Sequence, residues 1–220
     1  MTTSSSKALP RYIAVEGPIG VGKTSLCKRL AGTFAYDLLL EKAEQNPFLE
    51  RFYQNPRQHA LATQLFFLFQ RAQQIQDIRQ DDLFARVRIA DFLIEKDQLF
   101  AQQTLEPDEY GLYSNVYDHL IIDAPTPDLV IYLQAPTEVL LDRIQRRGIP
   151  AEQLIDRRYL DRLNEAYTTF FHFYTKAPLL IVNCTHIDLV GNEDDYQQLV
   201  DYIKTVPTGT QYFNPKPALL

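Results

Sequence analysis

The segment at residues 17–24 reads Gly-Pro-Ile-Gly-Val-Gly-Lys-Thr and fits the phosphate-binding pattern G-x-x-x-x-G-K-[ST]. Residues 12–15 before it are typical of a buried strand, and residues 25–30 after it carry apolar side chains three or four apart, as in an amphipathic helix. Glycines in such a loop let backbone N–H groups and the helix N-terminus point at phosphate oxygens. Strand, loop and helix in this order predict that the chain binds a nucleoside triphosphate.

The residues of this loop have separate expected tasks. Lys23 places a positive charge beside the β- and γ-phosphates, and Thr24 offers a hydroxyl to Mg²⁺. We also expect loop contacts with the nucleotide from five neighbouring residues: Gly17, Gly20, Val21, Gly22 and Ser25.

Length and composition restrict the class of protein. A chain of 220 residues is long enough for one α/β domain and too short for two ordinary ones. Its net charge of −6 argues against non-specific nucleic-acid binding. There is no apolar run long enough to span a membrane, and residues 1–7 lack the apolar core of a signal peptide, so we expect a cytoplasmic protein that does not bind membranes. Cys27 and Cys184 are expected to be buried, reduced thiols.

Apolar segments of β type alternate with helical segments along the chain. This alternation predicts a doubly wound α/β fold with a parallel, five-stranded sheet flanked by helices. Residues 1–10 read as a flexible tail, 11–205 as the single domain, and 206–220, with three prolines, as a C-terminal tail. The strands are expected at 12–15, 36–40, 87–90, 129–133 and 179–182, and the helices near 58–80, 92–104, 107–121, 136–147, 156–175 and 193–205.

Two carboxylates directly follow predicted strands. Glu41 comes after the second strand and Asp91 after the third, so both are expected to face the same cleft as the phosphate loop. Phosphoryl transfer needs a metal ion held in place and an acceptor hydroxyl that is aligned and deprotonated. Either residue alone is equally well explained as a solvated residue of a turn or helix start, but their shared position favours function.

Three arginines end the predicted helix at 136–147. Arg143 and Arg147 lie on one helix face, Arg146 lies beside them, and Gly148 follows. Cations at a helix C-terminus are commonly only solvated charges that the helix dipole favours. In a chain that binds a triphosphate, we expect these arginines to bind it as part of a lid over 147–155, and Arg143 and Arg147 to take part in catalysis.

These segments together resemble the deoxyribonucleoside kinases, particularly the bacterial branch that phosphorylates deoxyadenosine, deoxyguanosine or deoxycytidine. The resemblance covers about residues 11–187 and implies a P-loop kinase fold with an arginine-bearing lid. It also implies transfer of a phosphoryl group from ATP, with Mg²⁺, to the 5′-hydroxyl of a deoxynucleoside. The matching segments lie at 13–20, 46–53, 64–68 and 143–148.

The resemblance assigns roles to individual residues. Glu41 is similar to the family's base toward the 5′-hydroxyl, and Tyr53 and Glu152 to the residues that bind the 3′-hydroxyl. Gln64 resembles the glutamine that pairs with the nucleobase, and Arg71 the arginine further along the same helix. An exposed polar stripe on an apolar helix is the alternative explanation for Gln64 and Arg71.

The chain also departs from the family pattern. Where the animal branch has Glu-Arg-Ser, residues 90–92 read Ala-Asp-Phe. Asp91 is still expected to hold Mg²⁺ with Thr24 and to border the substrate, but the arginine near the 5′-hydroxyl has no counterpart unless Arg88 supplies it. Lys42 follows Glu41 in place of an acid or proline, and Ile149 replaces a further lid arginine.

Other functions remain open at this point. A thymidylate-type nucleoside monophosphate kinase would need arginines in its acceptor pocket, where only Arg71 is placed. A nucleotide-binding subunit without catalysis is the second alternative; Lys42 and Ile149 give it some weight. A GTP-binding switch would need an Asn-Lys-x-Asp segment, which the sequence lacks. The apolar run at 65–69, with the resemblance, favours a homodimer, and the sequence does not determine the preferred base.

Overall fold

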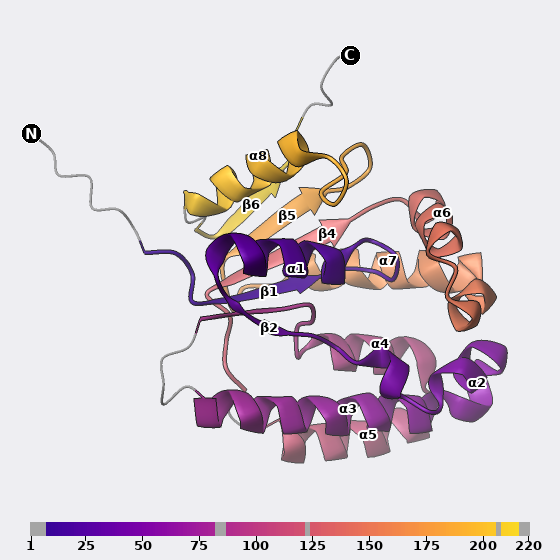
Figure 1. The fold of residues 1–220 in the computed structure, drawn as a ribbon. Coiled ribbons are helices and arrows are strands. Elements are labelled where there is room, and N and C mark those ends of the chain that lie inside the picture. Colours follow the sequence, from indigo (N-terminus) through magenta and orange to yellow (C-terminus); the bar gives the residue numbers. More distant parts are fainter. Residues whose placement is uncertain (1–7, 82–86, 122–123, 206–207, 216–220) are drawn as a thin grey trace, which may run out of the picture.

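A parallel sheet of six strands forms the centre of the described part of the chain (Figure 1). The computed structural model describes residues 8–81, 87–121, 124–205 and 208–215. The strand order is β2-β3-β1-β4-β5-β6, and every pair of neighbours is parallel. The strands are β1 (Tyr12–Glu16), β2 (Asp37–Leu39), β3 (Arg88–Ala90), β4 (Leu129–Gln134), β5 (Leu179–Asn183) and β6 (Thr210–Phe213).

The sixth strand corrects the expected strand count. β6 lies in the segment that was expected to be a C-terminal tail, where it pairs with β5 at the edge of the sheet. Only Phe213 of its four residues is buried, so the strand leaves almost no hydrophobic pattern in the sequence. The other five strands confirm the predicted order of elements. Most of the expected N-terminal tail, residues 1–7, lies outside the described residues.

The long helices agree with the sequence prediction to within a few residues. The short elements α2, η1 and η3 were not expected, because six residues or fewer carry too little periodicity to identify a helix. The helix expected from residue 92 begins only at Lys96. The helices are α1 (Lys23–Phe34), α2 (Leu49–Gln54), α3 (Pro56–Asp81), α4 (Lys96–Thr104), α5 (Pro107–Leu120), α6 (Thr137–Arg147), α7 (Arg157–His172) and α8 (Glu193–Lys204), with 3₁₀ helices η1 (Ala43–Gln45) and η3 (Pro150–Leu154).

Helices cover both faces of the sheet. On one face, side chains of α1, α6 and α8 such as Leu30, Leu140 and Leu199 pack on the strands in the largest apolar cluster. On the other face, α4 and α7 pack through Leu99 and Tyr167. Helix α5 lies outside α3 and forms an additional helical layer (Figure 1). The prediction of free, buried cysteines at 27 and 184 is confirmed.

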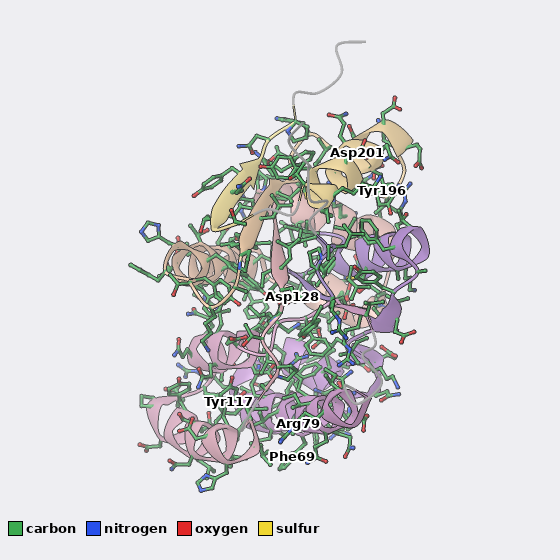
Figure 2. All side chains as sticks on the ribbon, turned by 90° about the vertical axis from the view of Figure 1, so that its left-hand side faces the viewer. Phe69, Arg79, Tyr117, Asp128, Tyr196 and Asp201 are labelled. Carbon is green, nitrogen blue, oxygen red and sulfur yellow. The ribbon has the colours of Figure 1, made fainter. Side chains whose placement is uncertain are left out.

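The two ends of the strands have different tasks. At the amino ends, the Asp128 carboxylate accepts hydrogen bonds from the backbone N–H groups of Arg11 and Tyr12 and fixes the start of β1 (Figure 2). At the carboxyl ends, β1 continues directly into the phosphate loop and α1. In the described residues, no helix combines the length and apolarity that crossing a membrane would require.

Candidate active site

The phosphate loop adopts a conformation that its glycines make possible. Gly17 has φ 151°, and a Cβ atom there would lie 2.3 Å from the carbonyl oxygen of Leu133. Gly20 has φ 85°, and its Cβ would lie 2.8 Å from the Ile144 side chain. Gly22, at φ 105°, precedes the first turn of α1. The backbone N–H groups of that turn have no partner within the helix, so they are available to an anion.

The lysine of the loop folds back over it. Lys23 Nζ donates to the carbonyl oxygens of Gly17 at 2.7 Å and Pro18 at 3.2 Å. Burial lowers the pKa of Lys23, and nearby Lys96 lowers it further, whereas Glu16 opposes the shift. The ammonium group therefore lies in the phosphate loop, where its positive charge would stabilise a bound phosphate. The negative charge of that phosphate would in turn keep Lys23 protonated.

Asp91 joins the phosphate loop to the end of β2. Thr24 Oγ1 donates to Asp91 Oδ2 at 2.5 Å, and the backbone N–H of Glu41 donates to Asp91 Oδ1 at 2.7 Å. The expected metal ligands, Thr24 and Asp91, are thus adjacent, as are the two carboxylates predicted from the strand ends. A hydroxyl and a carboxylate are hard oxygen donors of the kind that Mg²⁺ prefers, so these residues fit that ion.

The Glu41 carboxylate lies between two cations. Arg71 Nη2 is 2.7 Å from Glu41 Oε1, and Lys96 Nζ is 2.6 Å from Glu41 Oε2. Arg71 Nε also binds Asp97 Oδ1 at 2.5 Å. Burial by itself raises the pKa of Glu41, but Lys96 and Arg71 outweigh it and hold this pKa far below the usual range. Glu41 is therefore ionised at neutral pH and pre-aligned to accept a hydrogen bond.

A cavity beside these charges contains every residue that the sequence analysis expected at the acceptor. We call it the Glu41 cavity. Within it, Tyr53 is packed against Phe52, and burial followed by the proximity of Tyr159 and Glu152 raises the Tyr53 pKa. Its lining includes Lys23, Thr24, Glu41, Phe52, Tyr53, Gln64, Phe67, Arg71, Asp91, Lys96, Asp97, Phe100, Arg147, Glu152 and Tyr159.

Gln64 and Arg71 belong to the wall of this cavity. Their exposures are 4% and 1%, so the alternative of an exposed polar stripe on α3 is wrong. Gln64 Nε2 donates to Thr104 Oγ1 of α4 at 3.3 Å. Arg71 is held by Glu41 and Asp97, as described above. Packing of α3 against α4 turns both side chains inward.

A second hollow, the Arg143 groove, lies on the other side of the phosphate loop. Arg143 donates to the carbonyl oxygens of Val21 at 3.2 Å and Cys184 at 3.0 Å, which ties the loop to the end of β5. Gly20 and Arg147 line both this groove and the Glu41 cavity. The expected nucleotide-binding residues that line the groove are Gly20, Val21, Gly22, Ser25, Arg143, Arg146 and Arg147.

The segment expected to form a lid connects α6 with α7. Gly148 ends α6 with φ 68°, and η3 follows. Arg147 pairs with Glu152 across this turn, and Gln153 Nε2 donates to the Ile144 carbonyl at 3.0 Å. Arg146 pairs with Asp142 on the outer face of α6. Of the three arginines, Arg147 is thus the one that also borders the Glu41 cavity.

Sequence reasoning missed Lys96 and Asp97. Both are buried at the start of α4, and Lys96 joins Arg71 as the second cation bound to Glu41. Arg88 donates to the carbonyl oxygen of Ile78 in α3 at 3.4 Å. The available signal was a Lys-Asp pair five residues after Asp91, within an apolar stretch.

Comparison with known proteins identifies the family. The family model described as "Deoxynucleoside kinase" matches residues 13–207. A deoxyguanosine kinase from Bacillus subtilis is 34% identical, covering 88% of this chain and 96% of the relative, and a deoxyadenosine/deoxycytidine kinase from the same organism is 28% identical, covering 88% and 92%. A solved deoxyadenosine kinase from M. mycoides has the same fold, with a TM-score of 0.78 and 22% identity over 88% of this chain and 99% of that one. The chain therefore belongs to the deoxynucleoside kinase family and is a phosphotransferase that acts on deoxynucleosides.

Proposed function

We propose that this chain transfers the γ-phosphoryl group of ATP to the 5′-hydroxyl of a deoxynucleoside bound in the Glu41 cavity. The observation that carries this proposal is the position of an ionised carboxylate, Glu41, in a cavity that adjoins the phosphate loop and the Thr24–Asp91 pair. The triphosphate binds along the loop and the Arg143 groove, so donor and acceptor meet at Lys23.

The residues around the loop divide the chemical work. Glu41 accepts the proton of the 5′-hydroxyl as the O5′–P bond forms and the bond from the γ-phosphorus to the β-phosphate oxygen breaks. Lys23 leaves its carbonyl partners and donates to the phosphates, and Arg147 leaves Glu152 to bind the transferred group. Thr24 and Asp91 would hold Mg²⁺, which neutralises charge on the phosphates.

The opposite part of the cavity binds the sugar. Tyr53 and Glu152 lie on α2 and η3, two elements that pack on each other, and both line the Glu41 cavity. In this proposal the Tyr53 hydroxyl and the Glu152 carboxylate bind the 3′-hydroxyl. Release of Glu152 from Arg147 when the triphosphate arrives would couple binding of the two substrates.

The base binds against Gln64, Arg71 and Asp97. Within the described residues, Arg71 Nη1 and Asp97 Oδ2 are buried atoms without a hydrogen-bond partner, so the wall offers one donor and one acceptor. Both purines present acceptors and donors that match such a wall. The chain is 34% identical to the deoxyguanosine kinase from Bacillus subtilis, against 28%, 26% and 28% for three relatives named as deoxyadenosine/deoxycytidine or deoxyadenosine kinases. This difference leads us to propose deoxyguanosine as the preferred substrate.

One assay tests this proposal against its alternatives. The four deoxynucleosides and their 5′-monophosphates are incubated separately with ATP and Mg²⁺, and product formation is followed. We expect deoxyguanosine to give the highest kcat/KM. Turnover of monophosphates alone would establish a monophosphate kinase, and no turnover of any acceptor would establish an inactive subunit. A higher kcat/KM for another deoxynucleoside would contradict only the base preference.

We also infer a cytoplasmic homodimer. Phe69 of α3 and Leu112 of α5 are large apolar side chains that remain 56% and 53% exposed in the monomer. Figure 2 shows Phe69 at the outer edge of the helical layer, and α3 contacts α5 there. The free cysteines are consistent with a reducing compartment. Light scattering should give twice the chain mass for the native protein and the mass of one chain for Phe69→Glu.

A further inference from the structure

Lys96 occupies a position in the Glu41 cavity that no sequence motif indicated. It is the first residue of α4, and its side chain is 6% exposed. Its Nζ atom lies 2.6 Å from Glu41 Oε2, while the other carboxylate oxygen is bound by Arg71. A substrate group that binds to the Glu41 carboxylate would therefore lie within reach of Lys96.

A buried carboxylate keeps this lysine charged. Burial lowers the pKa of Lys96, but Glu16 and Glu41 oppose this effect, and the net shift is upward. Glu16 is fully buried and accepts hydrogen bonds from the backbone N–H groups of Gly17 and Leu93, both at 2.8 Å, and from the Tyr167 hydroxyl. Glu16 thereby joins the phosphate loop to the segment that leads into α4, so Lys96 has a fixed position relative to the loop.

The two cations on Glu41 are held differently. Arg71 is anchored twice, by Glu41 and by Asp97. Lys96 has one carboxylate partner among the described residues, Glu41, and its flexible stem carries three rotatable donors. Arg71 still binds Oε1 of Glu41 when Lys96 turns away from Oε2. Lys96 is therefore able to turn one of its N–H donors from Glu41 toward a bound substrate.

We propose that Lys96 is a catalytic residue that donates a hydrogen bond to the 5′-oxygen and the transferred phosphoryl group in the transition state. This inference rests on the proposed function, in which Glu41 binds the 5′-hydroxyl. As the proton moves from O5′ to Glu41, the carboxylate loses its charge and releases Lys96. Negative charge develops at the same time on the phosphoryl oxygens. Lys96 stays protonated throughout, the O5′–P bond forms, and ADP leaves with the electrons of the broken P–O bond.

The test compares three variants of the full chain with the native enzyme. Lys96→Met removes the charge, Lys96→Arg retains it, and Lys176→Met is the matched control. Lys176 is a 65% exposed lysine that pairs with Glu95, the residue next to Lys96. The measurements are kcat and KM for the deoxynucleoside, the Kd for MgATP, and the thermal unfolding midpoint.

We expect Lys96→Met to lower kcat by about 10²–10³-fold, as for loss of one transition-state donor, with little change in the Kd for MgATP. Lys96→Arg should stay within about tenfold of the native kcat, and Lys176→Met should match the native enzyme.

Several results would overturn the inference. The first is a Lys96→Met kcat within threefold of the native value. If Lys96→Met does not fold, Lys96→Arg decides alone, since a folded arginine variant that loses 100-fold or more in kcat excludes a role for the charge. The native enzyme distinguishes this inference from the proposed function. If the native chain forms no 5′-monophosphate, the proposed function is wrong. If the native chain is active and the Lys96 variants do not behave as expected, only the role of Lys96 is wrong.

Discussion

The two sets of charges on either side of the phosphate loop differ in how firmly they are held. In the Glu41 cavity, the side chains of Arg71, Lys96 and Asp97 are 1%, 6% and 3% exposed. In the lid, Arg146 and Arg147 are 70% and 44% exposed. The first set has been removed from water by folding, and the second has not.

This difference in burial implies a difference in use. Breaking a buried ion pair leaves an uncompensated charge and costs about 3–5 kcal/mol, whereas an exposed pair contributes about 0–1 kcal/mol. The cavity can therefore hold its charges in place before the substrate arrives. The lid pairs can be exchanged for contacts with phosphate at little cost. The comparison predicts that changes in the cavity affect both folding and rate, and that changes in the lid affect rate alone.

The largest effect should come from the carboxylate itself. Glu41→Gln keeps the shape but cannot accept the proton of the 5′-hydroxyl, so kcat should fall by about 10²–10⁴-fold with little change in substrate affinity. Asp91→Asn should behave differently, because a weakened metal site is partly rescued by excess Mg²⁺. Steady-state kinetics over a range of Mg²⁺ concentrations separates the two variants. Rescue of Glu41→Gln instead of Asp91→Asn would show that these two roles are reversed.

A substitution at Arg71 tests the buried half of the comparison. Arg71→Met removes one of two cations from Glu41 and the partner of Asp97, and should lower the free energy of unfolding by about 3–5 kcal/mol. Because the cations depress the folded-state pKa of Glu41, their stabilisation is fully present above its unfolded pKa of about 4.3 and is lost as the pH falls through the folded value. Urea unfolding at pH 7 provides the measurement, with Arg57→Met as a control, because Arg57 lies on the same helix and is 90% exposed.

An unchanged free energy of unfolding in Arg71→Met would contradict the view that this cluster is held by mutual charge compensation.

The contrast between the two regions also explains what the sequence revealed. The phosphate loop, Glu41 and Asp91 were predictable because each begins within two residues of the end of a strand, and parallel strands bring their carboxyl ends together. Lys96 and Asp97 were not, because their burial depends on packing of α4 against α3 and α7, which no local pattern encodes. Arg143 matched the expected motif, yet it contacts backbone carbonyls of Val21 and Cys184, a detail set by tertiary structure.

The sugar-binding residues give an effect of intermediate size. If Tyr53 and Glu152 bind the 3′-hydroxyl, a 2′,3′-dideoxynucleoside leaves these polar groups unpaired and should lose about 1–3 kcal/mol of binding. Tyr53→Phe should bind the deoxynucleoside more weakly than the native protein does. Its affinity for the dideoxynucleoside should change little, because that ligand has no 3′-hydroxyl to bind Tyr53. Isothermal titration with both ligands measures the four affinities. Equal affinity of the native protein for the two ligands would show that the 3′-hydroxyl is not recognised here.

The smallest effect on stability is expected in the lid, where it separates the two arginines by function. Arg146→Gln and Arg147→Gln each remove an arginine that is itself largely exposed, although Glu152, the partner of Arg147, is 16% exposed. Each variant should change the free energy of unfolding by about 1 kcal/mol or less, with the larger change in Arg147→Gln. Of these two arginines, Arg147 lines both the Glu41 cavity and the Arg143 groove, whereas Arg146 lines the groove alone. Loss of Arg147 should therefore lower kcat by about 10²-fold, the effect expected for one transition-state donor, while Arg146→Gln stays close to the native rate. Urea unfolding and steady-state kinetics on the same preparations give both quantities. If Arg147→Gln destabilises the protein as much as Arg71→Met does, the lid is part of the fixed structure and the distinction between the two regions is wrong. If Arg146→Gln has the lower kcat of the two variants, the transferred phosphoryl group lies on the outer side of α6.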